Sequence, residues 1–127
     1  MGRAMIWTVL QVAFGGALGA VARYLTGVAT LRVMGPGFPW GTITVNIVGS
    51  FVMGLAVVLL AQSGNRFAPL VMTGVLGGFT TFSAFSLDAY TLFERGQTAM
   101  AASYVFLSVA FSLAGIVLGV LTARALS

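Results

Sequence analysis

The chain of 127 residues contains no cysteine, no histidine and no lysine, and only two acidic residues. Without cysteine and histidine it has no thiol chemistry, no disulfides and few ways to bind a transition metal. Six arginines give a net charge of +4, but they are scattered among apolar segments and form no patch for nucleic acid. The sequence has no P-loop and no nucleophile elbow. We therefore expect neither an enzyme nor an organic cofactor.

Charge of either sign is scarce, because only 6% of the residues are charged and 59% are hydrophobic. Soluble domains carry about 25% charged residues. Apolar stretches cover residues 5–31, 40–61, 67–93 and 98–121 approximately, and each reaches the roughly 20 residues that cross a bilayer. The sequence predicts an all-α fold: one integral membrane domain over residues 1–127, with four spans in the lipid bilayer.

The arginines are almost evenly divided between the two sides that four spans would create. One side would carry Arg3, Arg66 and Arg124, and the other Arg32 and Arg95, joined by Arg23 if that side chain snorkels. The positive-inside rule needs an asymmetry to set orientation. Either other factors set a single orientation, or the chain inserts both ways and pairs as an antiparallel homodimer. The charges favour neither.

The third apolar stretch contains an unusual segment, GVLGGFTTFSAFS at residues 74–86. Adjacent glycines weaken a helix, and hydroxyls compete for its backbone carbonyls. Irregular backbone at membrane depth survives only when it is buried in protein or lines a wet cavity. We predict a broken helix beside a polar pathway. Its freed carbonyls suit a cation such as Na+. Phe79, Phe82 and Phe85 would share a side if the helix resumes, and their positive ring edges would attract a small anion.

Polar residues at helical spacing mark the other spans. Thr42, Asn46 and Ser50 share one face of the second span, and Tyr104, Ser108 and Ser112 share one face of the fourth. Asn46 either makes a hydrogen bond that stabilises packing or donates to an anion. Arg23 either snorkels, lines a vestibule or caps carbonyls of the broken helix. Asp88 either lies at the membrane interface or pairs with an arginine across a dimer.

Three blocks together resemble the Fluc/CrcB family of fluoride channels over nearly the whole length: GGALGAVARY at 15–24, GTITVNIVGSF at 41–51 and the 74–86 segment. The resemblance implies four-helix subunits with a broken third helix, assembled as an antiparallel, dual-topology homodimer in the cell inner membrane. It implies two pores and passive, selective export of fluoride from the cytoplasm, which lowers fluoride toxicity.

The resemblance also assigns residues. It makes Asn46 the pore asparagine, Phe82 and Phe85 the phenylalanine pair, and Thr42, Tyr104, Ser108 and Ser112 the polar track. It implies that the backbone carbonyls of Gly77 and Thr80 hold a structural Na+ at the dimer interface, and it matches Arg23 to an arginine near the end of the first helix. The chain departs from the family pattern at Asp88, where a glutamate is expected.

Two other functions stay open on the residues. A small proton-coupled transporter of the multidrug type would need an ionisable residue deep in a span. A membrane assembly subunit without transport activity would account for the glycine-rich faces but leave the polar stripes unexplained.

Overall fold

The computed structural model describes residues 2–127. Its helical elements follow in the order α1 (Gly2–Met34), α2 (Trp40–Leu59), η1 (Leu60–Ser63), η2 (Pro69–Leu76), α3 (Gly77–Phe79), α4 (Phe82–Glu94) and α5 (Thr98–Leu126). η1 is a 3₁₀ helix and η2 is a π-helix. Counted as spans, four helical segments are long and apolar enough to cross a membrane: Gly2–Met34, Trp40–Ser63, Pro69–Glu94 and Thr98–Leu126. The expectation of four transmembrane helices in an all-α chain is confirmed.

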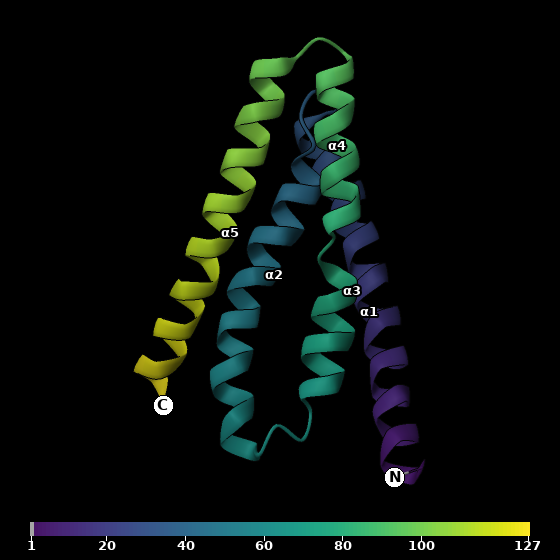
Figure 1. Cartoon of the computed structure of the whole chain (residues 1–127), viewed down its shortest axis with the longest axis vertical. Helices are drawn as coiled ribbons and strands as arrows, with labels where there is room; N and C mark the ends of the chain where they lie inside the picture. Colours follow the sequence, from purple (N-terminus) through teal and green to yellow (C-terminus); the bar gives the residue numbers. More distant parts are fainter. Residues whose placement is uncertain (1) are drawn as a thin grey trace.

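The helices alternate in direction, so both termini lie at the same end of the molecule (Figure 1). α2 packs along α5, and α1 packs along η2 and α3. The N-terminus, the connection over residues 60–68 and the C-terminus share the lower end in Figure 1. The arginines of those three segments therefore belong to one side of the membrane, as an even number of spans requires.

Glycines allow the helices to approach backbone to backbone. A Cβ atom on Gly19 of α1 would overlap the carbonyl oxygen of Val75, and one on Gly119 of α5 would overlap the carbonyl oxygen of Phe51. No side chain fits at either point. Small residues at helix contacts of this kind are typical of membrane proteins, in which close packing drives helix association.

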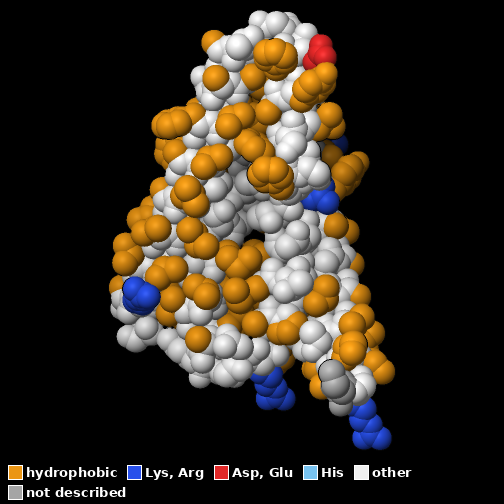
Figure 2. All heavy atoms as spheres, in the orientation of Figure 1, with side chains coloured by type: hydrophobic (Ala, Val, Ile, Leu, Met, Phe, Trp, Pro, Cys, Tyr) orange, Lys and Arg blue, Asp and Glu red, His pale blue; other side chains and the backbone are white. Residues whose placement is uncertain are grey.

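The surface of the single chain is covered by apolar side chains (Figure 2). At least half of the surface of Trp7, Phe14 and Leu18 on α1 is exposed, and the same is true of Phe106 and Leu113 on α5. A soluble protein rarely exposes so much contiguous apolar surface. The helix lengths and this surface identify a multi-pass membrane protein.

Candidate functional site

The helical backbone stops at Thr80 and Thr81, between α3 and α4. Thr80 has φ −87° and ψ 159°, and Thr81 has φ −153° and ψ 120°, so both residues are extended. The Thr81 hydroxyl accepts a hydrogen bond of 3.1 Å from the N–H of Ala84 and thereby caps α4. Glycines just before this point lower helix propensity, and threonine is a favoured N-cap residue. Local sequence therefore explains both the end of one helix and the start of the next.

Asn46 of α2 pairs with the backbone of Thr81 at both ends of its amide. Its Nδ2 donates to the Thr81 carbonyl at 3.0 Å, and the Thr81 N–H donates to its Oδ1 at 2.8 Å. The extended backbone is thus held by a side chain from another helix. The amide carries two N–H groups, and this pairing uses one of them. Of the two roles that the sequence left open, the interhelical hydrogen bond is present, and one donor remains.

Two carbonyls lose their usual helical partners where the backbone is extended. In a continuous helix the Gly77 carbonyl would accept from the N–H of Thr81, but that N–H donates to Asn46. The Thr80 carbonyl would accept from the N–H of Ala84, which donates to the Thr81 hydroxyl instead. Carbonyls released in this way are available to a cation. They are the two that the family resemblance assigned to Na+.

Arg23 of α1 contacts the same region. Its Nε donates to the Gly78 carbonyl at 3.0 Å, and the side chain is partly buried. The guanidinium therefore satisfies a third carbonyl of the interrupted helix. An arginine paired in this way costs less free energy at membrane depth than an unpaired one.

The three phenylalanines do not form one stripe. Phe79 is the last residue of α3. Its ring packs against Gly49 of α2, where an added Cβ atom would lie 3.3 Å from the ring. Phe82 and Phe85 belong to α4, with ring centroids 5.5 Å apart. Phe82 is 77% exposed, whereas Phe85 is 9% exposed. The expected shared side of all three required one helical period, and the extended residues Thr80 and Thr81 interrupt that period between Phe79 and Phe82.

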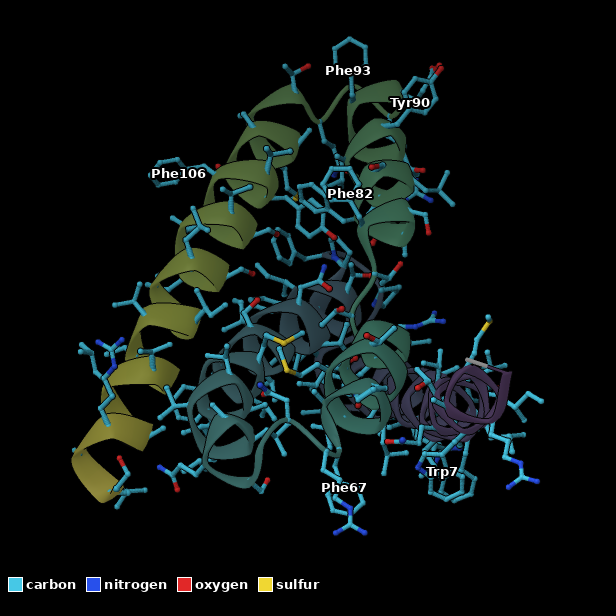
Figure 3. The ribbon with its side chains drawn as sticks, turned by 60° about the horizontal axis from the view of Figure 1, so that its bottom comes forward. Trp7, Phe67, Phe82, Tyr90, Phe93 and Phe106 are labelled. Carbon is cyan, nitrogen blue, oxygen red and sulfur yellow. The ribbon has the colours of Figure 1, made fainter. Side chains whose placement is uncertain are left out.

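A cavity of about 370 Å³ lies beside the phenylalanine pair. Its lining includes Asn46, Phe82, Phe85, Ser108 and Ser112. Phe82 projects from α4 toward the space between α4 and α5, whereas Phe106 points away from it (Figure 3). The Ser108 hydroxyl is buried and has no hydrogen-bond partner among the described residues. The cavity therefore combines an unpaired hydroxyl and an amide donor with aromatic rings.

Thr42 and Tyr104 do not line this cavity. Thr42 lines a second cavity, of about 560 Å³, together with Arg23 and Asp88. Tyr104 is fully buried, and its hydroxyl donates to Oδ2 of Asp88 at 3.1 Å. The four residues of the predicted polar track are thus divided, with Ser108 and Ser112 at one cavity and Thr42 at the other. Within the single chain Asp88 accepts a hydrogen bond from Tyr104, and pairing with an arginine across a dimer stays a prediction.

Sequence reasoning did not single out Thr81, although both its backbone and its hydroxyl make hydrogen bonds at the site. Its backbone pairs with Asn46, its hydroxyl caps α4, and it lines both cavities. The available signal was a threonine, a favoured N-cap residue, directly before the apolar residues that begin at Phe82. Gln11 was also missed. It is buried on α1, and its Oε1 has no partner among the described residues.

Comparison with known proteins decides the family. A family profile described as "CrcB-like protein, Camphor Resistance (CrcB)" matches residues 10–120. The chain belongs to the CrcB family.

Relatives of this CrcB-family chain align over nearly their full lengths. A protein of Cereibacter sphaeroides named fluoride-specific ion channel FluC is 65% identical over 120 residues, which cover 94% of this chain and 97% of the relative. A protein of the same name from a Ruegeria species is 59% identical and covers the same shares. A third, from Agrobacterium fabrum, is 52% identical, over 91% of this chain and 95% of the relative.

Proposed function

We propose that this chain is a fluoride-selective ion channel that exports fluoride passively from the cytoplasm and so lowers fluoride toxicity. The observation that carries the proposal is 65% identity, over nearly the full length of both chains, to a protein named as a fluoride-specific ion channel. The cavity at Asn46, Ser108 and the phenylalanine pair supports the same function. A passive channel needs no catalytic group, and we propose no enzymatic activity.

Fluoride is small and strongly hydrated, so a pathway must replace part of its water shell. The second N–H of Asn46 and the hydroxyls of Ser108 and Ser112 are donors for this purpose, and the edges of Phe82 and Phe85 are weakly positive. Several weak sites let an ion leave as well as enter. We propose that Thr42, Tyr104, Asp88 and Arg23 belong to the approach to this site.

We propose that the functional unit is a homodimer. In the single chain, Phe82 is 77% exposed although it lines the cavity beside Asn46. The polar wall of that cavity would face hydrocarbon unless protein covers it, and unsatisfied polar groups are costly in lipid. A second copy is the simplest cover. We propose further that the third span acts as two half-helices that meet at Thr80 and Thr81.

An antiparallel arrangement in the inner membrane fits the nearly even division of arginines between the two ends of the bundle. The chain has no cysteine, so the substitution Ser127→Cys would create its only thiol for labelling. In a dual-topology protein, a membrane-impermeant maleimide would label that site from both sides of the inner membrane. Labelling from one side alone would contradict the antiparallel arrangement.

We propose that the freed carbonyls of Gly77 and Thr80 hold a structural Na+ at the dimer interface. Backbone carbonyls of discontinuous membrane helices are suitable ligands for such an ion. One chain offers two of them, and a second copy related by a twofold axis would supply the same pair. When bound, the ion would supply positive charge that links the two copies. Arg23, through Gly78, would steady the backbone beside it.

Fluoride efflux from liposomes tests the function directly. Purified protein is reconstituted with fluoride or chloride inside, and efflux is followed with ion-selective electrodes. We expect fluoride efflux far above the chloride rate, a sharp loss in Phe82→Ile, and no loss in the matched variant Phe106→Ile, whose side chain points away from the cavity. Equal fluoride and chloride rates would exclude the channel. Efflux that depends on a pH gradient would favour the proton-coupled transporter, and the absence of any flux would favour the assembly subunit.

A further inference from the structure

Five aromatic rings contact one another in a row that begins at the connection between α1 and α2 and ends at the cavity. In order they are Trp40, Phe38, Tyr104, Phe85 and Phe82, with centroid distances of 4.7, 5.4, 5.3 and 5.5 Å. We call these five residues the aromatic row. Its last two members line the cavity. Phe38 lies in the loop between α1 and α2, and Trp40 is the first residue of α2; the proposed function assigns no role to either residue.

The loop holds Phe38 in place through its backbone. Gly35 directly follows α1 with φ +78°, and its N–H donates to the Leu31 carbonyl at 2.9 Å. The Phe38 carbonyl accepts from the N–H of Trp40 at 2.8 Å. Pro39, between them, has a φ that its ring restricts. The Phe38 ring is therefore presented by a short loop with little freedom, and it packs against the buried cluster around Tyr104.

Tyr104 is the central member of the row. It is 0% exposed, and its ring lies between Phe38 and Phe85. The Phe38 and Tyr104 rings meet edge to face at 85°, a favoured geometry for aromatic pairs. The Tyr104 hydroxyl donates to Asp88. The direction of that hydroxyl and the position of the Phe85 ring therefore both depend on the orientation of the Tyr104 ring.

We infer that Phe38 is a positioning residue for the anion pathway, acting through Tyr104 on Phe85. It lines neither the cavity beside Asn46 nor the one beside Asp88, so contact with the ion is not its role. Its edge-to-face contact constrains one side of the Tyr104 ring, and Tyr104 in turn constrains the Phe85 ring, whose centroid lies 5.3 Å away and which lines the cavity. This inference rests on the proposed function for its consequence, but the positioning itself is a property of the fold.

The test removes the ring and keeps the apolar volume. Phe38→Met and Phe38→Leu are two ring-free variants, so that the result does not depend on the folding of one of them, and Phe38→Tyr retains a ring. Phe106→Met is the matched control, because Phe106 is exposed and lies outside the row. An edge-to-face pair corresponds to about a two- to tenfold change in an equilibrium. We expect fluoride efflux per folded protein to fall by about that factor in the ring-free variants, and to stay near wild type in Phe38→Tyr and Phe106→Met.

A second measurement reports position without fluoride transport. The chain has three tyrosines, so 3-fluorotyrosine labelling gives a simple ¹⁹F NMR spectrum, in which Tyr104→Phe identifies the Tyr104 signal. We expect that signal to broaden or split in Phe38→Met and Phe38→Leu but not in Phe106→Met, since loss of the Phe38 ring current alone would shift the signal without broadening it. A Tyr104 signal as narrow as in the wild type would overturn the positioning, whatever the flux. A broadened signal with wild-type fluoride efflux would overturn its link to the pathway. If the wild-type protein shows no fluoride-selective efflux, the proposed function is refuted. The NMR measurement would then still decide whether Phe38 positions Tyr104.

Discussion

Replacing Asn46 by aspartate tests its two roles, because the change keeps the shape of the side chain but removes both of its N–H donors and adds a negative charge. The Asn46 Oδ1 that accepts from the Thr81 N–H is retained. The Nδ2 group, 3.0 Å from the Thr81 carbonyl, becomes a carboxylate oxygen that repels that carbonyl. The same substitution places a negative charge at the wall of the cavity that Asn46 shares with Phe82 and Ser108.

The two roles predict effects of different kinds. Loss of the bond to the Thr81 carbonyl costs about 1 kcal/mol, and leaving that carbonyl unpaired costs about 1–3 kcal/mol. Both are costs in stability. A fixed charge about 4 Å from an anion costs about 4 kcal/mol at an effective dielectric constant near 20. At about 1.4 kcal/mol for each factor of ten, fluoride occupancy beside the introduced carboxylate would fall by about a thousandfold.

The matched variant is Asn46→Leu, which is neutral and loses both hydrogen bonds to Thr81. Fluoride efflux from liposomes is measured for both variants and divided by the amount of folded protein, and thermal unfolding is followed in parallel. We expect Asn46→Leu to be the less stable variant and Asn46→Asp to have the lower efflux per folded molecule. If efflux per folded molecule falls at least as far in Asn46→Leu as in Asn46→Asp, the introduced charge adds nothing to the loss, and the anion does not pass beside this position.

Two further predictions concern the packing and the cation. Gly19→Ala should destabilise the fold by about 1–3 kcal/mol in denaturant unfolding, because its Cβ would overlap the Val75 carbonyl oxygen. Gly16→Ala is the control and should be nearly neutral, since nothing lies within 4 Å of that Cβ. Equal loss of stability in the two variants would contradict the close helix contact. Protein purified and reconstituted without Na+, in N-methylglucamine salts, should unfold at lower temperature and carry less fluoride, and unchanged behaviour would argue against a Na+ site at Gly77 and Thr80.

The sequence predicted the helices well because membrane spans follow from simple quantities. Length and hydropathy determine where a helix can cross hydrocarbon, and the connections here are too short to hide another element. Spacing of four residues also placed Ser108 and Ser112 on one face, and both line the same cavity as Asn46. Tyr104 belongs to the same stripe by spacing, yet it is buried and its hydroxyl reaches Asp88 instead. A long side chain can direct its polar group away from the face to which its Cα belongs.

The contacts between helices were beyond the reach of sequence patterns. The residues predicted an interrupted stretch around two glycines and two threonines, but nothing in them indicated that Asn46 would take both backbone groups of Thr81. That pairing joins positions 35 residues apart, and periodicity within one helix carries no information about a neighbour. The contact of Phe38 with Tyr104 is of the same kind. A phenylalanine in a turn rich in glycine and proline has no local signal that distinguishes it from an ordinary loop residue.

The hydrogen bonds at the interruption separate the two ion sites that we propose. At the end of α3, side chains accept the N–H groups that would otherwise donate to the Gly77 and Thr80 carbonyls, so these two oxygens remain for a cation, whereas the Gly78 carbonyl between them binds Arg23. At the start of α4, first-turn N–H groups make the local charge partly positive. A cation is therefore favoured on the α3 side and an anion on the α4 side, where Phe82 and Phe85 begin. The extended residues Thr80 and Thr81 keep these opposite helix ends apart, which a continuous helix could not do.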